Sequence, residues 1–93
     1  MSARTGPSTA TLGLIREAMA AARANDKPRT RKLLLDAVRL DPGNETAWQW
    51  LAGVAETPLE ATAALDRVLA LNPNNEKAKA AVRTTRLQAG VAA

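Results

Sequence analysis

The sequence predicts an all-α fold built from antiparallel helix hairpins, and three observations lead to this prediction. The stretch LDPGNETA at Leu40–Ala47 recurs as LNPNNEKA at Leu71–Ala78, and internal similarity at a fixed shift, here 31 residues, is typical of helical repeat proteins. Alanine, a strong helix former, accounts for 21 of the 93 residues. No run of alternating β-branched or aromatic residues is bounded by turn residues, so nothing in the sequence predicts a strand.

The first two predicted helices form one hairpin. Apolar residues recur on one face from Leu14 to Ala24, which predicts a helix that ends near the sequence AND. A second helix is predicted to begin at Pro28, because proline is accommodated in the first turn of a helix. This helix ends at Leu40, since the proline and glycine that follow do not continue it.

Capping residues mark the starts of the remaining helices. Asn44 supplies an N-cap oxygen for a third helix that continues to Ala55. The sequence TPLE has the spacing of a capping box, in which Thr57 caps the fourth helix and Glu60 bonds back to it. Asn75 caps a fifth helix in the same way as Asn44 caps the third, and a glycine at position 90 marks its end.

These elements predict one small domain. A polar, flexible arm of residues 1–11 precedes a domain at 12–90, which consists of a first repeat (12–43), a second repeat (44–74) and a capping helix (75–89). Each helix pair buries only part of its apolar face alone and needs the next pair to cover the rest. Two pairs and a cap are therefore close to the smallest array that can be stable.

The second repeat resembles the tetratricopeptide repeat family, whose pattern is W-x-x-L-G-x-x-Y, then A-x-x-x-F, then P. The residues that match by type are Trp48, Leu51, Ala61 and Pro73. The positions of the family's glycine, tyrosine and phenylalanine are occupied by Ala52, Ala55 and Leu65. The resemblance implies hairpins stacked as a short right-handed solenoid, with two helix pairs and a C-terminal capping helix.

In that family the first helix of each pair lines a concave groove that binds a peptide or helical segment of a protein partner. The corresponding positions of this sequence are Ile15, Met19, Arg23, Gln49, Trp50 and Lys77, together with Leu12, Thr46, Gly53 and Glu56. The family's clamp for acidic chaperone tails uses lysine, arginine and asparagine, and only Lys77 matches it. The resemblance therefore implies an apolar anchor, formed by Ile15, Met19 and Trp50, and argues against an acidic chaperone tail.

The two tryptophans are predicted to face in different directions. Trp48 shares a helical face with Leu51 and the alanines that follow it, which predicts a core position. Trp50 lies off that face, and because tryptophan is enriched at binding hot spots we predict that it is partly exposed, with packing between repeats as the alternative. For Ile15 and Met19 the alternative to partner contact is a place in the interior.

Basic residues provide a second hypothesis. The net charge is +4, and a basic patch of Lys27, Arg29, Arg31 and Lys32 stands in the first turns of a helix, where cations oppose the helix dipole. Such a patch binds an acidic protein segment, an anionic lipid surface or nucleic acid, or it only keeps the protein in solution. Nucleic acid is disfavoured, because stacking aromatic residues and recognition-helix signatures are missing.

Composition argues against catalysis. The sequence has no cysteine and no histidine, so it lacks the usual zinc ligands and the side chain most often used for proton transfer near neutral pH. It also lacks a glycine-rich phosphate loop, and we predict a protein that is not an enzyme and needs no metal or cofactor. Since neither a signal peptide nor a transmembrane segment is recognised, the expected location is the cytoplasm.

A third hypothesis is assembly. The predicted interior is thin and is closed at one end by a single helix. A second copy of the chain, or the body of a larger protein, would complete such an interior, so self-association is expected as an alternative to partner binding.

Overall fold

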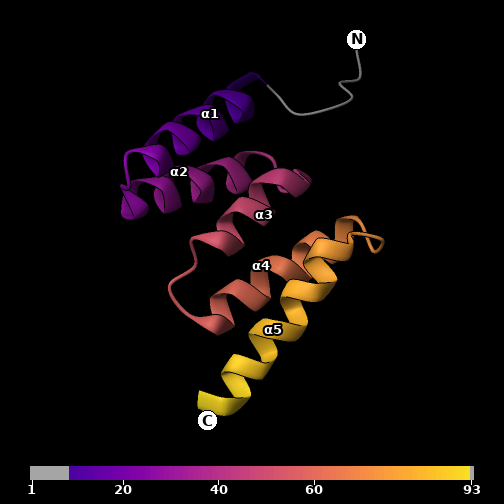
Figure 1. Ribbon diagram of the computed structural model, residues 1–93. Helices are drawn as coiled ribbons and strands as arrows, with labels where there is room; N and C mark the ends of the chain where they lie inside the picture. The colour runs from indigo at the N-terminus through magenta and orange to yellow at the C-terminus, as the bar shows by residue number, and fades with distance from the viewer. Residues whose placement is uncertain (1–8, 93) are drawn as a thin grey trace.

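The computed structural model describes residues 9–92, with side chains up to residue 87. Within that range the chain forms helices and no strand, which confirms the all-α prediction (Figure 1). Each helix packs against the next one along the chain. The helices are α1 (Thr9–Arg23), α2 (Lys27–Leu40), α3 (Glu45–Gly53), α4 (Pro58–Leu71) and α5 (Glu76–Ala92).

The helices lie in sequence order across an elongated and rather flat molecule. Its principal extents are 49, 31 and 18 Å, and α1 lies near one end while α5 lies near the other (Figure 1). The closest packing is within the pairs α1–α2, α3–α4 and α4–α5, whereas α2 and α3 meet over a smaller area. No helix of the described part is both long and apolar enough to cross a membrane.

The helix α1 begins earlier than the sequence pattern predicts. It starts at Thr9, so residues 9–11 belong to the helix and not to the predicted arm of residues 1–11. The physical reason is that Thr11 is buried, and a pattern that counts only apolar residues does not include a threonine. The rest of the predicted arm lies outside the described residues.

The helix α3 ends earlier than predicted. Its last residue is Gly53, and the backbone N–H of Val54 donates to the carbonyl of Leu51 at 3.2 Å. The N–H of Ala55 donates in the same way to Ala52, at 3.4 Å. These bonds span three residues, as in a 3₁₀ turn, and such turns commonly tighten the end of a helix.

The two similar turns of the sequence have the same capping geometry. The side-chain oxygen of Asn44 accepts from the backbone N–H of Ala47 at 3.0 Å, and Asn75 accepts from Ala78 at 3.0 Å. Both alanines are buried, at 0% and 1% exposure. The predicted caps are therefore confirmed.

The helices that lead into these two turns also end alike. Asp41 follows α2 with φ −141° and ψ 79°, and Asn72 follows α4 with φ −144° and ψ 87°. Their backbone N–H groups donate to carbonyls four residues earlier, at 2.9 and 2.8 Å. The turns thus have the same geometry on both sides, and the similarity of the two stretches in sequence extends to their local structure.

The turn between α1 and α2 is of a different kind. Asn25 has φ 63°, in the left-handed region. Its N–H donates to Ala22 at 3.0 Å while the N–H of Asp26 donates to Ala21 at 2.9 Å, and this pair of bonds is the Schellman motif that closes many helices. Asp26 then caps α2 by accepting from the N–H of Arg29 at 3.2 Å.

Two clusters of buried side chains form the core, and Trp48 packs against both. The first cluster comes from α1, α2 and α3 and includes Ile15, Ala18, Leu34, Val38 and Leu51. The second comes from α4 and α5 and consists of Leu65, Val68, Ala78 and Val82. Trp48 joins the two clusters, so the two hairpins share one continuous interior.

The predicted core position of Trp48 needs one correction, because this side chain is half-buried. Its indole N–H donates to the carbonyl of Pro42 at 2.8 Å. The guanidinium of Arg67 lies 5.4 Å from the ring centroid, within the range of a cation–π contact. The indole therefore packs against the core, while its polar edge and one face meet polar groups of the turn and of α4.

The left-handed conformation of Asn25 generates a stability prediction. We expect Asn25→Ala to lower the free energy of unfolding by about 1 kcal/mol, because alanine pays a steric cost at positive φ that asparagine tolerates better. The matched control is Asn74→Ala, since Asn74 is an exposed turn residue without positive φ. Urea-induced unfolding checks both variants, and equal effects of the two changes would contradict this reading.

Candidate functional site

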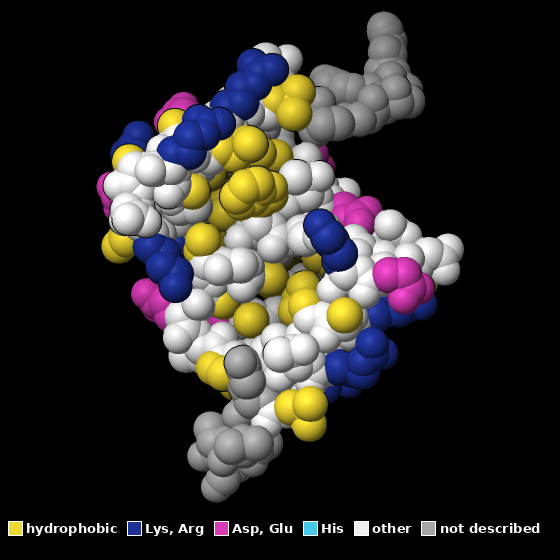
Figure 2. All heavy atoms as spheres, in the orientation of Figure 1, with side chains coloured by type: hydrophobic (Ala, Val, Ile, Leu, Met, Phe, Trp, Pro, Cys, Tyr) yellow, Lys and Arg dark blue, Asp and Glu magenta, His cyan; other side chains and the backbone are white. Residues whose placement is uncertain are grey.

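A cleft opens between α3 and α5 on the face shown in Figure 2. Its volume is about 440 Å³. On this face hydrophobic side chains gather over α1 to α3, and basic side chains lie around them (Figure 2). The lining residues of the cleft are Thr46, Gln49, Trp50, Gly53, Val54 and Lys77.

Trp50 supplies the aromatic wall of the cleft. It stands two residues after Trp48, and two residues turn an α-helix by about 200°, so the two indoles leave α3 on nearly opposite sides. Trp50 is 39% exposed, whereas Trp48 packs against the core. The predicted partial exposure of Trp50 is confirmed, and the cleft has a large apolar surface that a partner's side chain would cover.

Gly53 leaves open space beside Trp50. A Cβ atom added at Gly53 would meet no heavy atom within 4 Å, and the backbone there does not have positive φ. A side chain at this position would therefore be compatible with the fold and would occupy part of the cleft.

A second hollow continues the cleft towards α4. Its volume is about 360 Å³, and it shares Gln49, Gly53 and Lys77 with the first. Beyond them it is lined mostly by small side chains, namely those of Ala52, Ala61, Ala78, Ala81 and Thr85 together with Leu65. We call the two hollows together the α3–α5 groove.

Hydrogen bonds join the first half of α3 to the turn that precedes α5. The side-chain nitrogen of Asn75 donates to Glu45 at 2.6 Å and to Gln49 at 3.2 Å. The side-chain nitrogen of Asn72 donates to the same carboxylate oxygen of Glu45 at 3.2 Å. Gln49 is therefore tied to the turn that precedes α5, and this contact fixes its place in the groove wall.

The structure brings together one half of the predicted groove and not the other. Gln49, Trp50 and Lys77 line one cleft, as do Thr46 and Gly53. Ile15 is only 7% exposed and belongs to the core, which is the alternative place that we predicted for it. Met19 is half-buried against the same core, and Arg23 is exposed on α1 without lining the α3–α5 groove.

Sequence reasoning missed Val54 in the first cleft and most of the side chains that line the second hollow. Val54 follows the last residue of α3, and its half-buried side chain packs against the core as well as the cleft. A pattern that assumes α3 continues to Ala55 places Val54 on a regular helix. The spacing of apolar residues does not indicate that α3 ends at Gly53, so no sequence signal identified Val54 as a lining residue.

The basic patch is largely paired with carboxylates. Arg29 lies 3.7 Å from Glu17, and Lys32 lies 3.9 Å from Asp36. Both pairs are exposed, and such pairs contribute little to stability. They nevertheless lower the local positive charge, and Lys27 is the member of the patch that has no carboxylate partner among the described residues.

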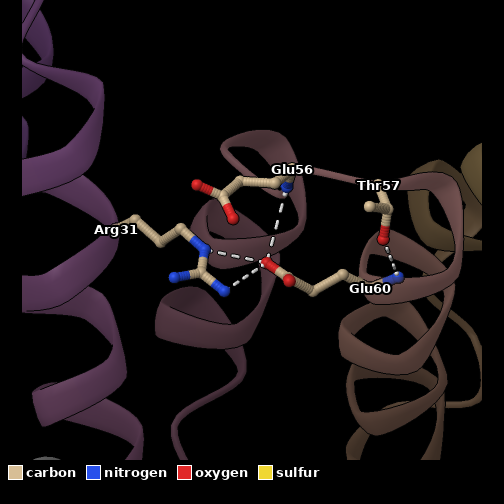
Figure 3. Close-up of polar contacts among 4 residues, drawn as sticks. All are labelled: Arg31, Glu56, Thr57 and Glu60. Carbon is tan, nitrogen blue, oxygen red and sulfur yellow. Dashed lines mark hydrogen bonds and ion pairs between the residues drawn. The ribbon is translucent and has the colours of Figure 1, made fainter.

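Arg31, the fourth member of the patch, is half-buried and joins the two hairpins (Figure 3). Its Nε and Nη2 atoms both lie 2.8 Å from one carboxylate oxygen of Glu60 on α4. Thr57 accepts from the N–H of Glu60 at 3.1 Å, which confirms the predicted cap. The Glu60 carboxylate reaches the N–H of Glu56 at 3.5 Å, one residue before the partner that a capping box would give.

No group of three or more acidic side chains that could hold a metal ion occurs in the part of the chain that the structure describes. No protein-family model matches this chain, and no curated protein matches it.

The different settings of the two tryptophans generate a fluorescence prediction. We expect the emission of Trp50, isolated in a Trp48→Phe variant, to be quenched by acrylamide more strongly than that of Trp48, isolated in Trp50→Phe. The reason is that Trp50 lines an open cleft, while Trp48 is held by the core and by Arg67. Equal quenching constants in the two folded variants would show that the cleft wall is not open.

Proposed function

We propose that the chain is a tetratricopeptide-like helical repeat domain that binds a segment of a protein partner in the α3–α5 groove, as a non-catalytic adaptor or scaffold. The observation that carries this proposal is the exposed indole of Trp50 in a preformed cleft of about 440 Å³. Partly exposed tryptophans in concave sites are common binding hot spots.

The repeated turn supports the solenoid part of the proposal. Asn44 caps α3 and Asn75 caps α5 with the same bond lengths, and two pairs of residues 31 positions apart, Ala47 with Ala78 and Leu51 with Val82, are buried to the same extent. A unit that recurs with the same turn and the same buried face stacks in one direction. The first helices of successive pairs then border a groove, and α3 and α5 occupy those places.

The alternative of a basic binding surface receives less support. Three of the four cations in the predicted patch lie within 4 Å of a carboxylate, and Arg31 is engaged between the hairpins. A patch built for phosphates or acidic lipids needs cations that are free to meet them. We therefore favour the groove over the patch as the binding surface.

The test of the groove uses peptides selected from a random dodecapeptide library against the folded chain. We expect Trp50→Ala to weaken the selected peptides by at least about tenfold, because an anchor indole typically contributes about 2 kcal/mol or more. Gly53→Leu should weaken them as strongly, since its side chain would enter the cleft. Isothermal titration gives the dissociation constants.

The control for this test is Gly13→Leu. Gly13 lies on α1, and an added Cβ there also meets nothing within 4 Å, so the substitution has the same chemistry outside the groove. Peptides that bind Gly53→Leu and Gly13→Leu equally well would contradict the proposal, provided that circular dichroism shows both variants folded.

Assembly is a second candidate, because two leucines are strongly exposed. Leu59 on α4 and Leu87 on α5 are 77% and 70% exposed. Since α4 and α5 are antiparallel and joined by a short turn, both leucines stand at the end of the pair away from that turn. A second copy of the chain packing there would remove both side chains from water.

Sedimentation equilibrium at several concentrations tests this second candidate. If it holds, the protein dimerises as concentration rises, and Leu59→Gln with Leu87→Gln abolishes the dimer by removing its apolar contact. The matched control is Leu40→Gln with Leu71→Gln, which changes two leucines that are exposed elsewhere. A strictly monomeric protein over the whole concentration range would exclude this candidate.

A further inference from the structure

The orientation of one asparagine side chain is fixed by its capping role. The oxygen of Asn75 accepts the N–H of Ala78, so the amide nitrogen must point the other way. That nitrogen donates to Glu45 at 2.6 Å and to Gln49 at 3.2 Å. Helix capping therefore fixes the side-chain nitrogen of Asn75 towards α3, and only a hydrogen-bond acceptor on α3 can pair with that nitrogen.

This constraint extends to Gln49. Its side-chain oxygen is taken by Asn75, so its NH₂ group is the part left to meet other molecules. No described residue accepts from that NH₂ group, and Gln49 lines both hollows of the groove. The groove thus presents an unpaired donor whose orientation is set from the turn before α5.

The other nitrogen groups of the cleft are also donors without partners. The ammonium of Lys77 has no ion pair among the described residues, whereas the neighbouring Lys79 pairs with Glu76 at 3.3 Å. The indole nitrogen of Trp50, which can only donate, has no acceptor in the described part either. The one hydroxyl of the lining, that of Thr46, can donate or accept.

We propose, on the basis of the function proposed above, that the groove selects a protein segment in which an apolar side chain against Trp50 is accompanied by one carboxylate. The carboxylate lies between the Gln49 amide and the Lys77 ammonium, two donors that share the same hollows. Glu45 and Asn75 are positioning residues, because they aim the Gln49 donor without lining the cleft themselves.

A segment that brought a donor to this place would be rejected. Its N–H or ammonium group would face Gln49 and Lys77, and each would lose water without gaining a partner, which is costly for buried polar groups. A neutral amide would satisfy one donor and leave the Lys77 charge unmatched. The carboxylate satisfies both, and bonds from a charged donor to a carboxylate are stronger than neutral ones.

The decisive variant exchanges the carboxylate and the amide of the positioning pair: Glu45→Gln combined with Asn75→Asp. Net charge is unchanged, and aspartate caps a helix about as well as asparagine. Position 75 then only accepts, so Gln49 must turn its NH₂ group towards it and present its oxygen to the groove. The expected result is loss of the preference for a carboxylate, with apolar binding to Trp50 kept.

The probes are dodecapeptides from the same random library, chosen because their binding depends on Trp50. We expect these peptides to be enriched in aspartate or glutamate next to a large apolar residue. For each, a partner peptide with asparagine or glutamine in place of the acid is made. The wild-type chain should bind the acidic member at least tenfold more tightly, and the exchanged variant should bind both members within about threefold.

Gln49→Glu is a second variant in case the exchanged one does not fold. It keeps an oxygen for Asn75 and replaces the free donor by an acceptor, so the preference should fall in the same way. Lys77→Gln should also reduce the preference, and Lys79→Gln, which changes a lysine outside the cleft lining, should leave it unchanged.

The outcomes separate this inference from the proposed function. Peptides that require Trp50 but show no preference for a carboxylate would overturn the inference and leave the proposed function standing. A preference that persists unchanged in both Gln49→Glu and the exchanged variant would overturn the positioning role. If no selected peptide binds the wild-type chain better than Trp50→Ala, the proposed function fails and this inference fails with it.

Discussion

The hydrogen bond that the N–H of a buried alanine donates to the side-chain oxygen of an N-cap asparagine is the interaction on which the remainder of the fold depends. It satisfies one of the orphan N–H groups at the start of each new helix. Ala47 and Ala78 are almost completely buried, so the capped N–H groups lie where α3 and α5 pack against the rest of the chain. The same cap geometry therefore begins both α3 and α5.

The parts of the fold that the sequence predicts are those decided by neighbouring residues. Caps, proline-marked ends and the all-α class depend on spacings of a few positions, and they are confirmed at Asn44, Thr57 and Asn75. The contact between Arg31 and Glu60 joins residues 29 positions apart, and no local rule indicates that an arginine in a basic run bonds to a carboxylate of α4. The burial of Ile15 is of the same kind, since periodicity assigns a helix two faces without saying which is covered.

The candidate site divides in the same way. Helical periodicity separates Trp48 from Trp50, because two residues along a helix lie on opposite sides. The resemblance to a repeat family places Gln49 and Lys77 near Trp50, and the structure puts the three in one cleft. The hydrogen bonds between Glu45 and Asn75 have no sequence signature. The side-chain oxygen of a capping asparagine accepts from the helix, but the partner of its side-chain nitrogen is decided by tertiary packing.

The turn before α3 shows why that network matters. Asn44 caps α3 as Asn75 caps α5, but its amide nitrogen donates to no side chain in the described part of the chain. The amide nitrogen of Asn75, in contrast, donates to both Glu45 and Gln49 on α3. The two turns therefore share their structural role, while only the second couples it to the groove. Asn75 both caps α5 and orients Gln49. A substitution at Asn75 would therefore change the stability of α5 and the group that Gln49 presents to the cleft at the same time.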